Sequence, residues 1–252
     1  MPGRKRKWFY KALLVLLVLG CVVFIFRDAI LNLLITHFWD EDPKLWEREI
    51  IAFEKAASAS PPPRDAIVFI GSSSIRLWSS LQSDMHPVPV IQRGFGGARM
   101  HDVVFYGARL LQVEQPRALV VFVGTNDIHP GMVQEPTVLL NRFQQFVAIA
   151  RAEFAEIPIY YIGITPSPLR WAVWGIAQQT NALIADYAAS DPQLHIIDTA
   201  PHLLGASGEP NPKNYRFDGL HLSEKGYAIW AEIIRARLLA DFPDYISNSL
   251  SK

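Results

Sequence analysis

A serine, a histidine and an aspartate in this chain have the types and spacing that nucleophilic acyl chemistry requires. The serine is Ser73, in the stretch "IVFIGSSSIRLW" (residues 67–78), where a glycine and three serines follow an apolar run. Asp218 and His221 stand three residues apart in "RFDGLHL", just before a predicted C-terminal helix. A carboxylate can orient an imidazole and stabilise its cation, and the imidazole can then take a proton from a serine hydroxyl.

Other motifs that use glycine and serine do not fit the same stretch. The nucleophile elbow G-x-S-x-G requires a second glycine where this chain has Ile75, and the phosphate-binding P-loop requires a Gly-Lys-Ser/Thr sequence that is missing after Gly71. Taken separately, Asp218 has an alternative interpretation as a helix cap and His221 as an incidental histidine. Two ligands at this spacing without a third nearby do not favour a metal site.

Alternating strand and helix patterns follow the first 42 residues. The apolar runs are nearly continuous and rich in Val, Ile, Tyr and Phe, which is typical of parallel strands covered on both faces. These runs lie at residues 66–70, 88–91, 118–123, 157–164 and 194–198. Helical patterns lie between them at residues 100–112, 136–154 and 171–189, one precedes them at residues 42–60, and a last one follows at residues 223–241. This alternation predicts a three-layer α/β/α domain with a parallel sheet of about five strands.

Glycine-rich and polar segments follow the first three apolar runs. They are "GSSS" (residues 71–74), "RGFGG" (93–97) and "GTND" (124–127). Because ligand sites in parallel sheets form at the carboxyl ends of the strands, we expect these segments to lie at one edge of the sheet.

Together with "DGLH" (residues 218–221), these segments resemble the four sequence blocks of the SGNH, or GDSL-like, hydrolase superfamily, in the same order. The resemblance extends from about Trp46 to Leu239. The stretches "TPSPLRWAVW", "SSIRLW" and "GYAIW" further resemble the periplasmic lysophospholipase/acetylhydrolase-like branch. The resemblance implies a flavodoxin-like SGNH hydrolase fold and the activity of a serine esterase that needs no metal or organic cofactor.

The resemblance implies roles for five residues. Ser73 would be the nucleophile and a backbone donor to the oxyanion, and His221 would be the base, oriented by Asp218. Gly97 would donate its backbone N–H, and Asn126 its side-chain amide. The residue types agree with these roles, because glycine permits a close backbone approach and an amide supplies donors that a carboxylate lacks.

Two residues depart from the family signature. Ser72 stands where the family has the aspartate of "GDS", and Ser74 stands where it has leucine. Neither position carries one of the implied catalytic groups, so the implied chemistry is retained.

The pattern of the N-terminal sequence predicts that the protein is attached to a membrane. Residues 1–11 carry five basic side chains and no acidic one, and an uncharged run extends from Ala12 to Phe26. An uncleaved signal anchor is the favoured interpretation, because no small-x-small cleavage site follows the run. The alternatives are a lipoprotein modified at Cys21, in "VLGC", and a cleaved signal peptide. The basic flank predicts a cytoplasmic N-terminus in a bacterial inner membrane, with the catalytic domain in the periplasm or outside the cell.

The predicted organisation has four parts. A basic tail and transmembrane anchor occupy residues 1–28, and a membrane-proximal segment occupies residues 29–42. The hydrolase domain extends over residues 43–245, and residues 246–252 form a tail.

Charge and cysteine content exclude several classes of protein. The chain has 252 residues, and its formal net charge is zero. Beyond residue 11 it carries 19 basic against 24 acidic residues, which argues against nucleic-acid binding because phosphate neutralisation needs a basic face. With Cys21 as its one cysteine, it can form no intramolecular disulfide and no cysteine-rich metal site.

The predicted reaction is the hydrolysis of acetyl, short acyl or lysophospholipid-like esters, so the partners are small-molecule, lipid or sugar esters. The alternatives are an O-acyltransferase that uses the same residues on a sugar or other alcohol, and a non-catalytic ligand-binding module. Among the other polar residues, we expect His129 in a solvated loop and Arg99 exposed or in a salt bridge. Trp171 and Trp174 are expected to pack a helix onto the core.

Overall fold

The computed structural model describes residues 3–26, 42–112 and 115–250 of the chain. The chain forms two compact units, Met1–Trp39 and Asp40–Lys252. In the first unit, the helix α1 spans Gly3–Ile25.

The transmembrane anchor predicted for residues 1–28 is not supported by the structure. Within the described ranges, no helix combines the length and the apolar character needed to cross a membrane. The basic side chains of α1 reach as far as Lys11, and the uncharged residues 12–25 that follow span only ~21 Å of helix, against a hydrocarbon core of ~30 Å. The membrane-proximal segment predicted for residues 29–42 lies outside the described residues, with the exception of Asp42.

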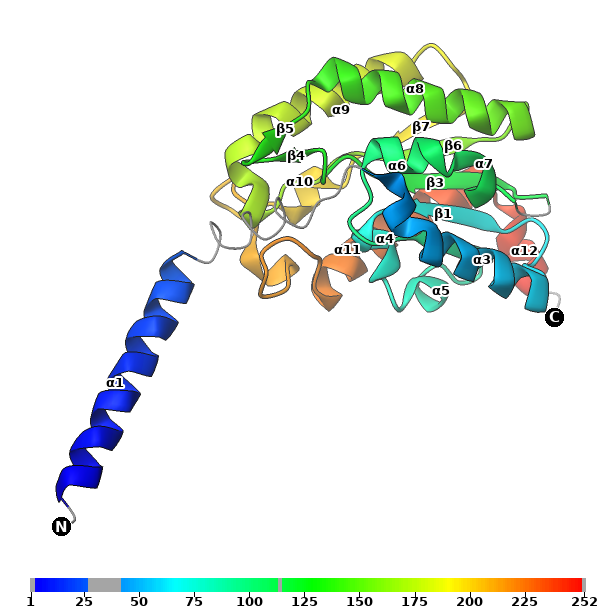
Figure 1. Ribbon diagram of the computed structural model, residues 1–252. Helices are drawn as coiled ribbons and strands as arrows, with labels where there is room; N and C mark the ends of the chain where they lie inside the picture. Colours follow the sequence, from blue (N-terminus) through cyan, green and yellow to red (C-terminus); the bar gives the residue numbers. More distant parts are fainter. Residues whose placement is uncertain (1–2, 27–41, 113–114, 251–252) are drawn as a thin grey trace. The chain divides into compact units, whose positions relative to one another are not determined.

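The second unit is built on a sheet of five parallel strands in the order β2-β1-β3-β6-β7 (Figure 1). Numbered along the chain within this sheet, the order is 2-1-3-4-5, as in flavodoxin-like folds. The strands are β1 Ile67–Gly71, β2 Val90–Gly94, β3 Ala118–Phe122, β6 Ile159–Ile162 and β7 Leu194–Ile197. The predicted α/β class and the parallel sheet of five strands are therefore confirmed.

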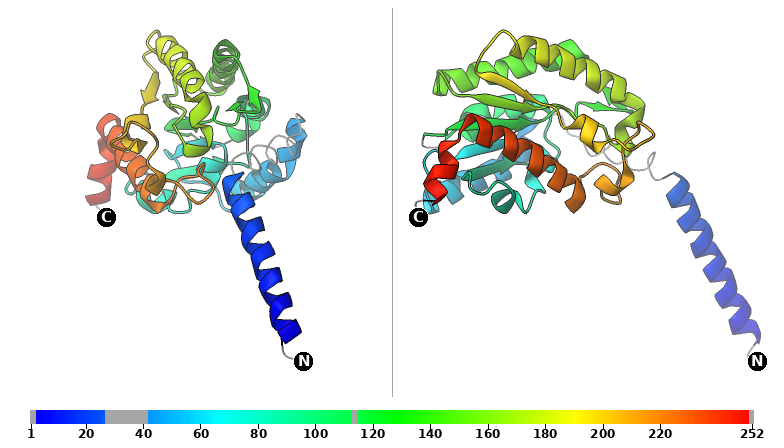
Figure 2. Two further views of the ribbon diagram at one scale, coloured as in Figure 1. Left: turned by 90° about the vertical axis from the view of Figure 1, so that its left-hand side faces the viewer. Right: turned by 180° about the vertical axis from the view of Figure 1, so that it is seen from behind.

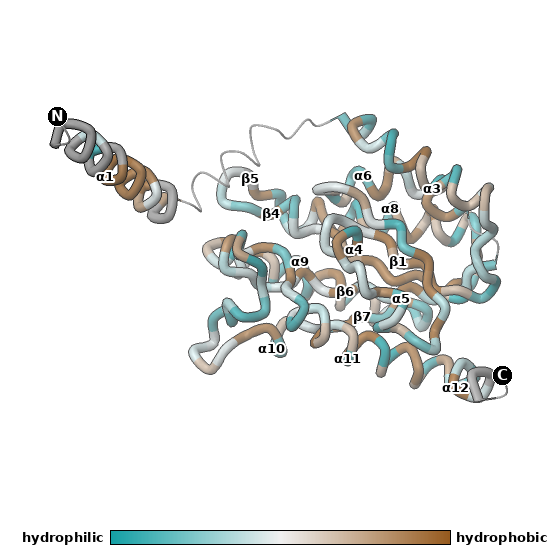
Figure 3. Tube along the Cα trace, turned by 90° about the horizontal axis from the view of Figure 1, so that it is seen from below, coloured by the Kyte–Doolittle hydropathy of each residue, from teal (hydrophilic) through white to brown (hydrophobic). Residues whose placement is uncertain are grey.

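The register of the central strands brings their carboxyl ends level with one another. Gly71 at the end of β1 pairs with Gly94 of β2 on one side and with Phe122 of β3 on the other. All residues of β1 and β3 are buried, which explains why their sequences are continuously apolar. Figure 3 shows this apolar character along β1. The segments that follow the three strands consequently start side by side at one edge of the sheet.

One face of the sheet is covered by helices from the first and middle parts of the unit. They are α3 Glu47–Ala59, which follows the 3₁₀ turn η1 Pro43–Trp46, and α6 Met100–Phe105, α7 Gly107–Leu110, α8 Pro136–Glu153 and α9 Trp174–Ala188. The helices α8 and α9 run side by side over this face (Figure 2). Phe143 and Phe146 of α8 and Ile184 of α9 belong to the core on this side, together with Val68 and Val121 of the sheet.

The opposite face carries a second core that is rich in aromatic side chains. The helices on this side are α4 Ser73–Arg76, α5 Leu81–Asp84, α11 Glu224–Asp241 and α12 Asp244–Leu250. Trp230 of α11 lies at the centre, and its ring centroid is 4.7 Å from Phe122 and 5.8 Å from Trp78. Tyr227 stacks on Trp78 at 5.3 Å. This cluster holds α11, and the loop that precedes it, against the sheet.

Several short elements were not predicted from the sequence. Among them are the hairpin strands β4 Ile128–His129 and β5 Met132–Val133, the 3₁₀ turns η2 Pro168–Val173 and η3 Pro212–Asn214, and the helix α10 Ala200–Leu203. Each has six residues or fewer, which is too short to show a hydrophobic period. The predicted helix at residues 171–189 accordingly begins as η2 and becomes α-helical at Trp174.

Replacing Trp230 by alanine should destabilise the fold strongly. Trp230 is fully buried and packs against Phe122 of the sheet and against Trp78, which follows α4. A large-to-small change at such a site costs ~3–5 kcal/mol of unfolding free energy, because a cavity remains. Chemical denaturation would measure this loss, with Phe105→Ala as the control, since Phe105 is 57% exposed and should change stability by no more than ~0.5 kcal/mol. Equal effects of the two substitutions would contradict the central position of Trp230.

Candidate active site

The turn after β1 places Ser73 at the start of a helix. Gly71 permits the turn, because a Cβ atom there would lie 2.1 Å from the carbonyl oxygen of Phe122. The carbonyl of Ser72 then accepts the N–H groups of Ile75 and Arg76, at 3.0 and 3.1 Å, which starts α4. Ser73 is the first residue of α4, where backbone N–H groups have no partner within the helix. Its hydroxyl and its N–H therefore both lie at the carboxyl edge of the sheet.

Three side chains from two distant parts of the sequence form a continuous hydrogen-bonded relay. The Ser73 Oγ atom lies 2.9 Å from Nε2 of His221, although the two residues are 148 positions apart in the chain. On the other side of the ring, Nδ1 of His221 lies 2.6 Å from Oδ2 of Asp218. A serine hydroxyl, an imidazole and a carboxylate in this order can activate the serine oxygen for attack on a carbonyl.

Asp218 holds both the histidine ring and its own loop. While Oδ2 faces the imidazole, Oδ1 accepts the backbone N–H groups of Leu220 and His221 at 2.8 and 2.9 Å. Burial raises the pKa of Asp218, but the hydrogen bonds from the His221 ring and from these two N–H groups outweigh burial and hold the pKa at about 2. The carboxylate therefore stays ionised at neutral pH. The helix α11, which follows this loop, has a different cap, because the Ser223 hydroxyl accepts the N–H of Gly226 at 3.3 Å.

The loop that carries Asp218 and His221 is fastened to its surroundings by backbone hydrogen bonds. The N–H of Arg216 donates to the carbonyl of His221 at 2.7 Å and closes the loop on itself. The N–H of Leu169 in η2 donates to the carbonyl of Gly219 at 2.9 Å, and the Tyr215 hydroxyl donates to the carbonyl of Pro166. These bonds tie the loop to the segment that follows β6.

The two further residues for which the resemblance implies oxyanion donation lie in the segments that follow the neighbouring strands. Asn126 follows β3 and is 4% exposed; its side-chain Nδ2 donates to the carbonyl of Ala98 at 3.1 Å. An amide nitrogen carries two hydrogens, so one is left to face a ligand. Gly97 is half-buried in the loop between β2 and α6. The structure therefore brings Ser73, Gly97 and Asn126 to the ends of three adjacent strands.

The glycine before Gly97 has a separate packing role. Gly96 has a φ of +29°, and a Cβ atom there would lie 1.7 Å from the ring of Trp46. The Trp46 ring fills this space and meets Phe95 edge to face, with the centroids 6.1 Å apart. The first glycine of "FGG" thus lets η1 pack over the loop, which leaves the second glycine, Gly97, as the candidate donor.

A buried carboxylate that was not considered from the sequence joins two of these segments. Asp127 is completely buried; its Oδ2 accepts the N–H of Met100 at 2.9 Å, and its Oδ1 lies 3.3 Å from Nη1 of Arg142 in α8. With the bond from Asn126 to Ala98, it connects the segment after β3 to the segment that contains Gly97. The sequence signal was a carboxylate directly after Asn126, soon after the apolar run of residues 118–123.

His129 is buried, contrary to the solvated loop expected for it, and Arg99 is buried as well. His129 lies in β4 and is 0% exposed, and its Nδ1 accepts the N–H of Gly131 at 3.2 Å. Burial lowers the pKa of His129 to about 4, with Arg170 and Arg99 acting in the same direction, so the ring is neutral at neutral pH. Arg99 and Arg170 are themselves 3% and 4% exposed. The physical reason is the unpredicted hairpin, because β4 packs beside η2 and encloses these side chains.

Asp127→Asn should change how stability depends on pH. Burial raises the pKa of Asp127 from 3.8 to about 7, against the opposing effects of the Met100 N–H and of Arg142. Above about pH 4 the unfolded state loses the Asp127 proton, whereas the folded state keeps it up to about pH 7. The stability that the protonated Asp127 contributes to the folded state is therefore lost as the pH rises through about 7. Relative to Asp127→Asn, the unfolding free energy of the wild type should fall between pH ~4 and ~7, by at most ~1.4 kcal/mol per unit.

Denaturant titrations of both proteins across this range would measure the difference in unfolding free energy. A difference that stays constant with pH would show that Asp127 is ionised throughout.

Comparison with solved structures identifies relatives of the same fold. A protein from Streptococcus pneumonia has a TM-score of 0.67 at 20% identity, covering 78% of this chain and 91% of that chain. A GDSL-like lipase from Bacteroides thetaiotaomicron has a TM-score of 0.63 at 20% identity, covering 76% and 98%. A lipase/acylhydrolase from Enterococcus faecalis has a TM-score of 0.57 at 18% identity, covering 71% and 97%. At these identities the likeness shows the fold alone.

Comparison with curated proteins gives no significant match. The sequence model of one family, however, matches residues 71–229, which is more than half of the chain. The matched range contains the relay residues Ser73, Asp218 and His221 together with Gly97 and Asn126. This chain therefore belongs to the GDSL-like lipase/acylhydrolase family.

Proposed function

We propose that the protein is a serine esterase that hydrolyses acyl esters through a covalent acyl-enzyme on Ser73. The observation that carries the proposal is the relay in which Ser73 Oγ lies 2.9 Å from His221, and His221 lies 2.6 Å from Asp218. Membership of an acylhydrolase family supports the same class of reaction. The proposed substrates are acetyl and other acyl esters, including lysophospholipid-like esters.

The first half-reaction forms the acyl-enzyme. His221 Nε2 takes the hydroxyl proton of Ser73 while Oγ forms a bond to the ester carbonyl carbon. The carbonyl oxygen becomes an oxyanion, for which the Ser73 N–H, the Gly97 N–H and the Asn126 amide are the proposed donors. When the tetrahedral intermediate collapses, the bond to the alcohol oxygen breaks and His221 gives its proton to the departing alcohol.

The second half-reaction releases the acid. His221 takes a proton from a water molecule, whose oxygen attacks the acyl carbon and forms a second oxyanion in the same position. Collapse of this intermediate breaks the bond to Ser73 Oγ, and the proton returns to the serine. Asp218, ionised because its pKa is held at about 2, stabilises the imidazolium in both halves of the cycle.

A fluorophosphonate probe should label Ser73, because only an activated serine reacts rapidly with such a reagent. Labelling and ester hydrolysis should both disappear in Ser73→Ala. The matched control is Ser72→Ala, because Ser72 contributes its carbonyl to the turn and its side chain has no role in the relay. Mass spectrometry of the labelled peptide identifies the site. Labelling that persists in Ser73→Ala would contradict the proposal.

Asn126→Ala should lower kcat by ~10²–10³ with little change in KM, which is the usual loss for one oxyanion donor. The matched control is Thr125→Val, which removes a neighbouring hydroxyl whose buried oxygen has no hydrogen-bond partner within the described residues. Steady-state kinetics on a soluble ester would measure both variants. If Asn126→Ala loses no more activity than Thr125→Val, Asn126 is not a donor to the oxyanion.

A further inference from the structure

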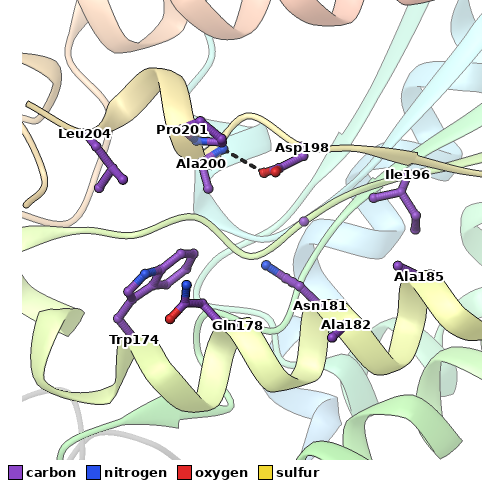
Figure 4. Close-up of a pocket in the computed structure, with 11 residues that line it drawn as sticks. Trp174, Gln178, Asn181, Ala182, Ala185, Ile196, Asp198, Ala200, Pro201 and Leu204 are labelled. Atoms are coloured by element: carbon purple, nitrogen blue, oxygen red, sulfur yellow. Dashed lines mark hydrogen bonds between the residues drawn. The ribbon is translucent and has the colours of Figure 1, made fainter. Parts of the chain in front are cut away.

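A groove beside β7 has no part in the relay described above. Its volume is about 480 Å³, which lies within the range of small-molecule sites, ~300–1,000 Å³. One wall is the helix α9, with Trp174, Gln178 and Ala182. Figure 4 shows the opposite wall, which contains Pro201 and Leu204 in and just after α10.

The walls of the groove are mainly apolar, and its polar groups are largely engaged. Asn181 accepts the N–H of Ile164 and donates to the carbonyl of the same residue, both at 2.8 Å. Asp198, at the exposed rim, accepts the N–H of Ala200 at 3.0 Å. Within the described part of the chain, no lysine, arginine or histidine lines the groove. This chemistry suits a hydrocarbon chain and does not suit a phosphate or another anion.

The groove opens at the same edge of the sheet as the relay. Gly163 and Asp198, which line it, directly follow β6 and β7, just as Ser73 follows β1. The lining residue Gly163, directly after β6, marks the side of the groove nearest to the relay. In the strand order β1-β3-β6, this side is two strand spacings from β1, or ~10 Å. An extended chain advances roughly 3.5 Å per three bonds. A two-carbon acyl group on Ser73 is therefore too short to reach the groove, whereas a chain of about eight to ten carbons is long enough.

One wall is bonded to the loop that carries the relay, and the other is bonded to the segment just before that loop. Trp174 directly follows η2, and Leu169 of η2 donates its N–H to the carbonyl of Gly219, between Asp218 and His221. On the other wall, the carbonyl of Leu203 in α10 accepts the N–H of Asn211 at 3.0 Å. The groove and the relay thus share one hydrogen-bonded framework, so their relative position is held.

We infer that this groove binds the acyl chain of the substrate, and that the enzyme prefers esters of medium-chain fatty acids to acetate esters. The inference rests on the proposed esterase function and adds to it the class of acyl group. The acyl carbonyl lies at Ser73, and the distal part of the chain packs between Trp174 and Leu204. Each methylene group buried there contributes binding energy that an acetyl group lacks.

The test compares 4-nitrophenyl decanoate with 4-nitrophenyl acetate on the full-length chain. Ala182→Trp fills the groove from the exposed side of α9. It should lower kcat/KM for decanoate at least tenfold, since even one methylene group in an apolar pocket changes the rate by ~10-fold or more. The value for acetate should stay within about twofold, because acetate does not reach the groove. The control is Gln179→Trp, which adds the same bulk at an exposed position of α9 outside the groove.

The outcomes separate this inference from the esterase proposal. Selective loss of decanoate hydrolysis in Ala182→Trp, but not in Gln179→Trp, supports the groove. Equal loss for both esters, or no loss for either, overturns it while Ser73-dependent hydrolysis remains. If the wild type hydrolyses no ester, the esterase proposal fails, and calorimetric titration of Ser73→Ala with decanoate still decides the groove. If Ser73→Ala binds decanoate and the added substitution Ala182→Trp removes this binding, the groove is supported. If decanoate does not bind, or binds equally well with Ala182→Trp, the groove is overturned.

Discussion

The close approach of β1 and β3 at Gly71 is the constraint on which the arrangement of the site depends. At this point no side chain fits, because a Cβ atom would lie 2.1 Å from the carbonyl oxygen of Phe122. The pairing of the two strands can therefore continue to the last residue of β1, and the chain turns immediately into α4. Ser73 reaches the edge of the sheet only because the strand ends there, level with β2 and β3.

Hydrogen bonds between the loops at this edge then fix the positions of the site residues relative to one another. The contacts from Asn126 to Ala98 and from Met100 to Asp127 join the segments after β2 and β3. The contact from Leu169 to Gly219 joins the segment after β6 to the relay loop. Because loops alone have little intrinsic rigidity, such cross-links are what hold the side chains of a site in position. The complete burial of Asp127 strengthens its cross-link, since water cannot compete for the Met100 N–H.

The two faces of the sheet contribute to different properties: one to the stability of the fold, and the other to the proposed choice of acyl group. The aromatic core around Trp230 anchors α11 and, through it, the loop with Asp218 and His221. The other face carries α9, whose first turns form one wall of the apolar groove. Changes in the groove can therefore alter which acyl group fits while the aromatic core and the relay stay intact. In this arrangement, the proposed chemistry and the proposed acyl preference depend on different parts of the fold.

The local sequence determined the strands and the candidate nucleophile, because both depend on short-range signals. Continuous apolar runs mark buried parallel strands, and a glycine before Ser73 marks the turn after one of them. The five strands and the longer helices were predictable for this reason, and the resemblance to a known family supplied roles for Gly97, Asn126, Asp218 and His221.

The tertiary structure alone decided which of these residues meet. The contact between Ser73 and His221 spans 148 positions, and a separation of that length leaves no local pattern in the sequence. Burial is non-local in the same way: His129, Arg99 and Asp127 look like surface residues in the sequence, and they are buried because elements distant in the sequence pack around them, such as β4 beside η2 and Arg142 of α8 beside Asp127. The groove has the same origin, since its two walls come from α9 and α10, which are neighbours only in the folded chain.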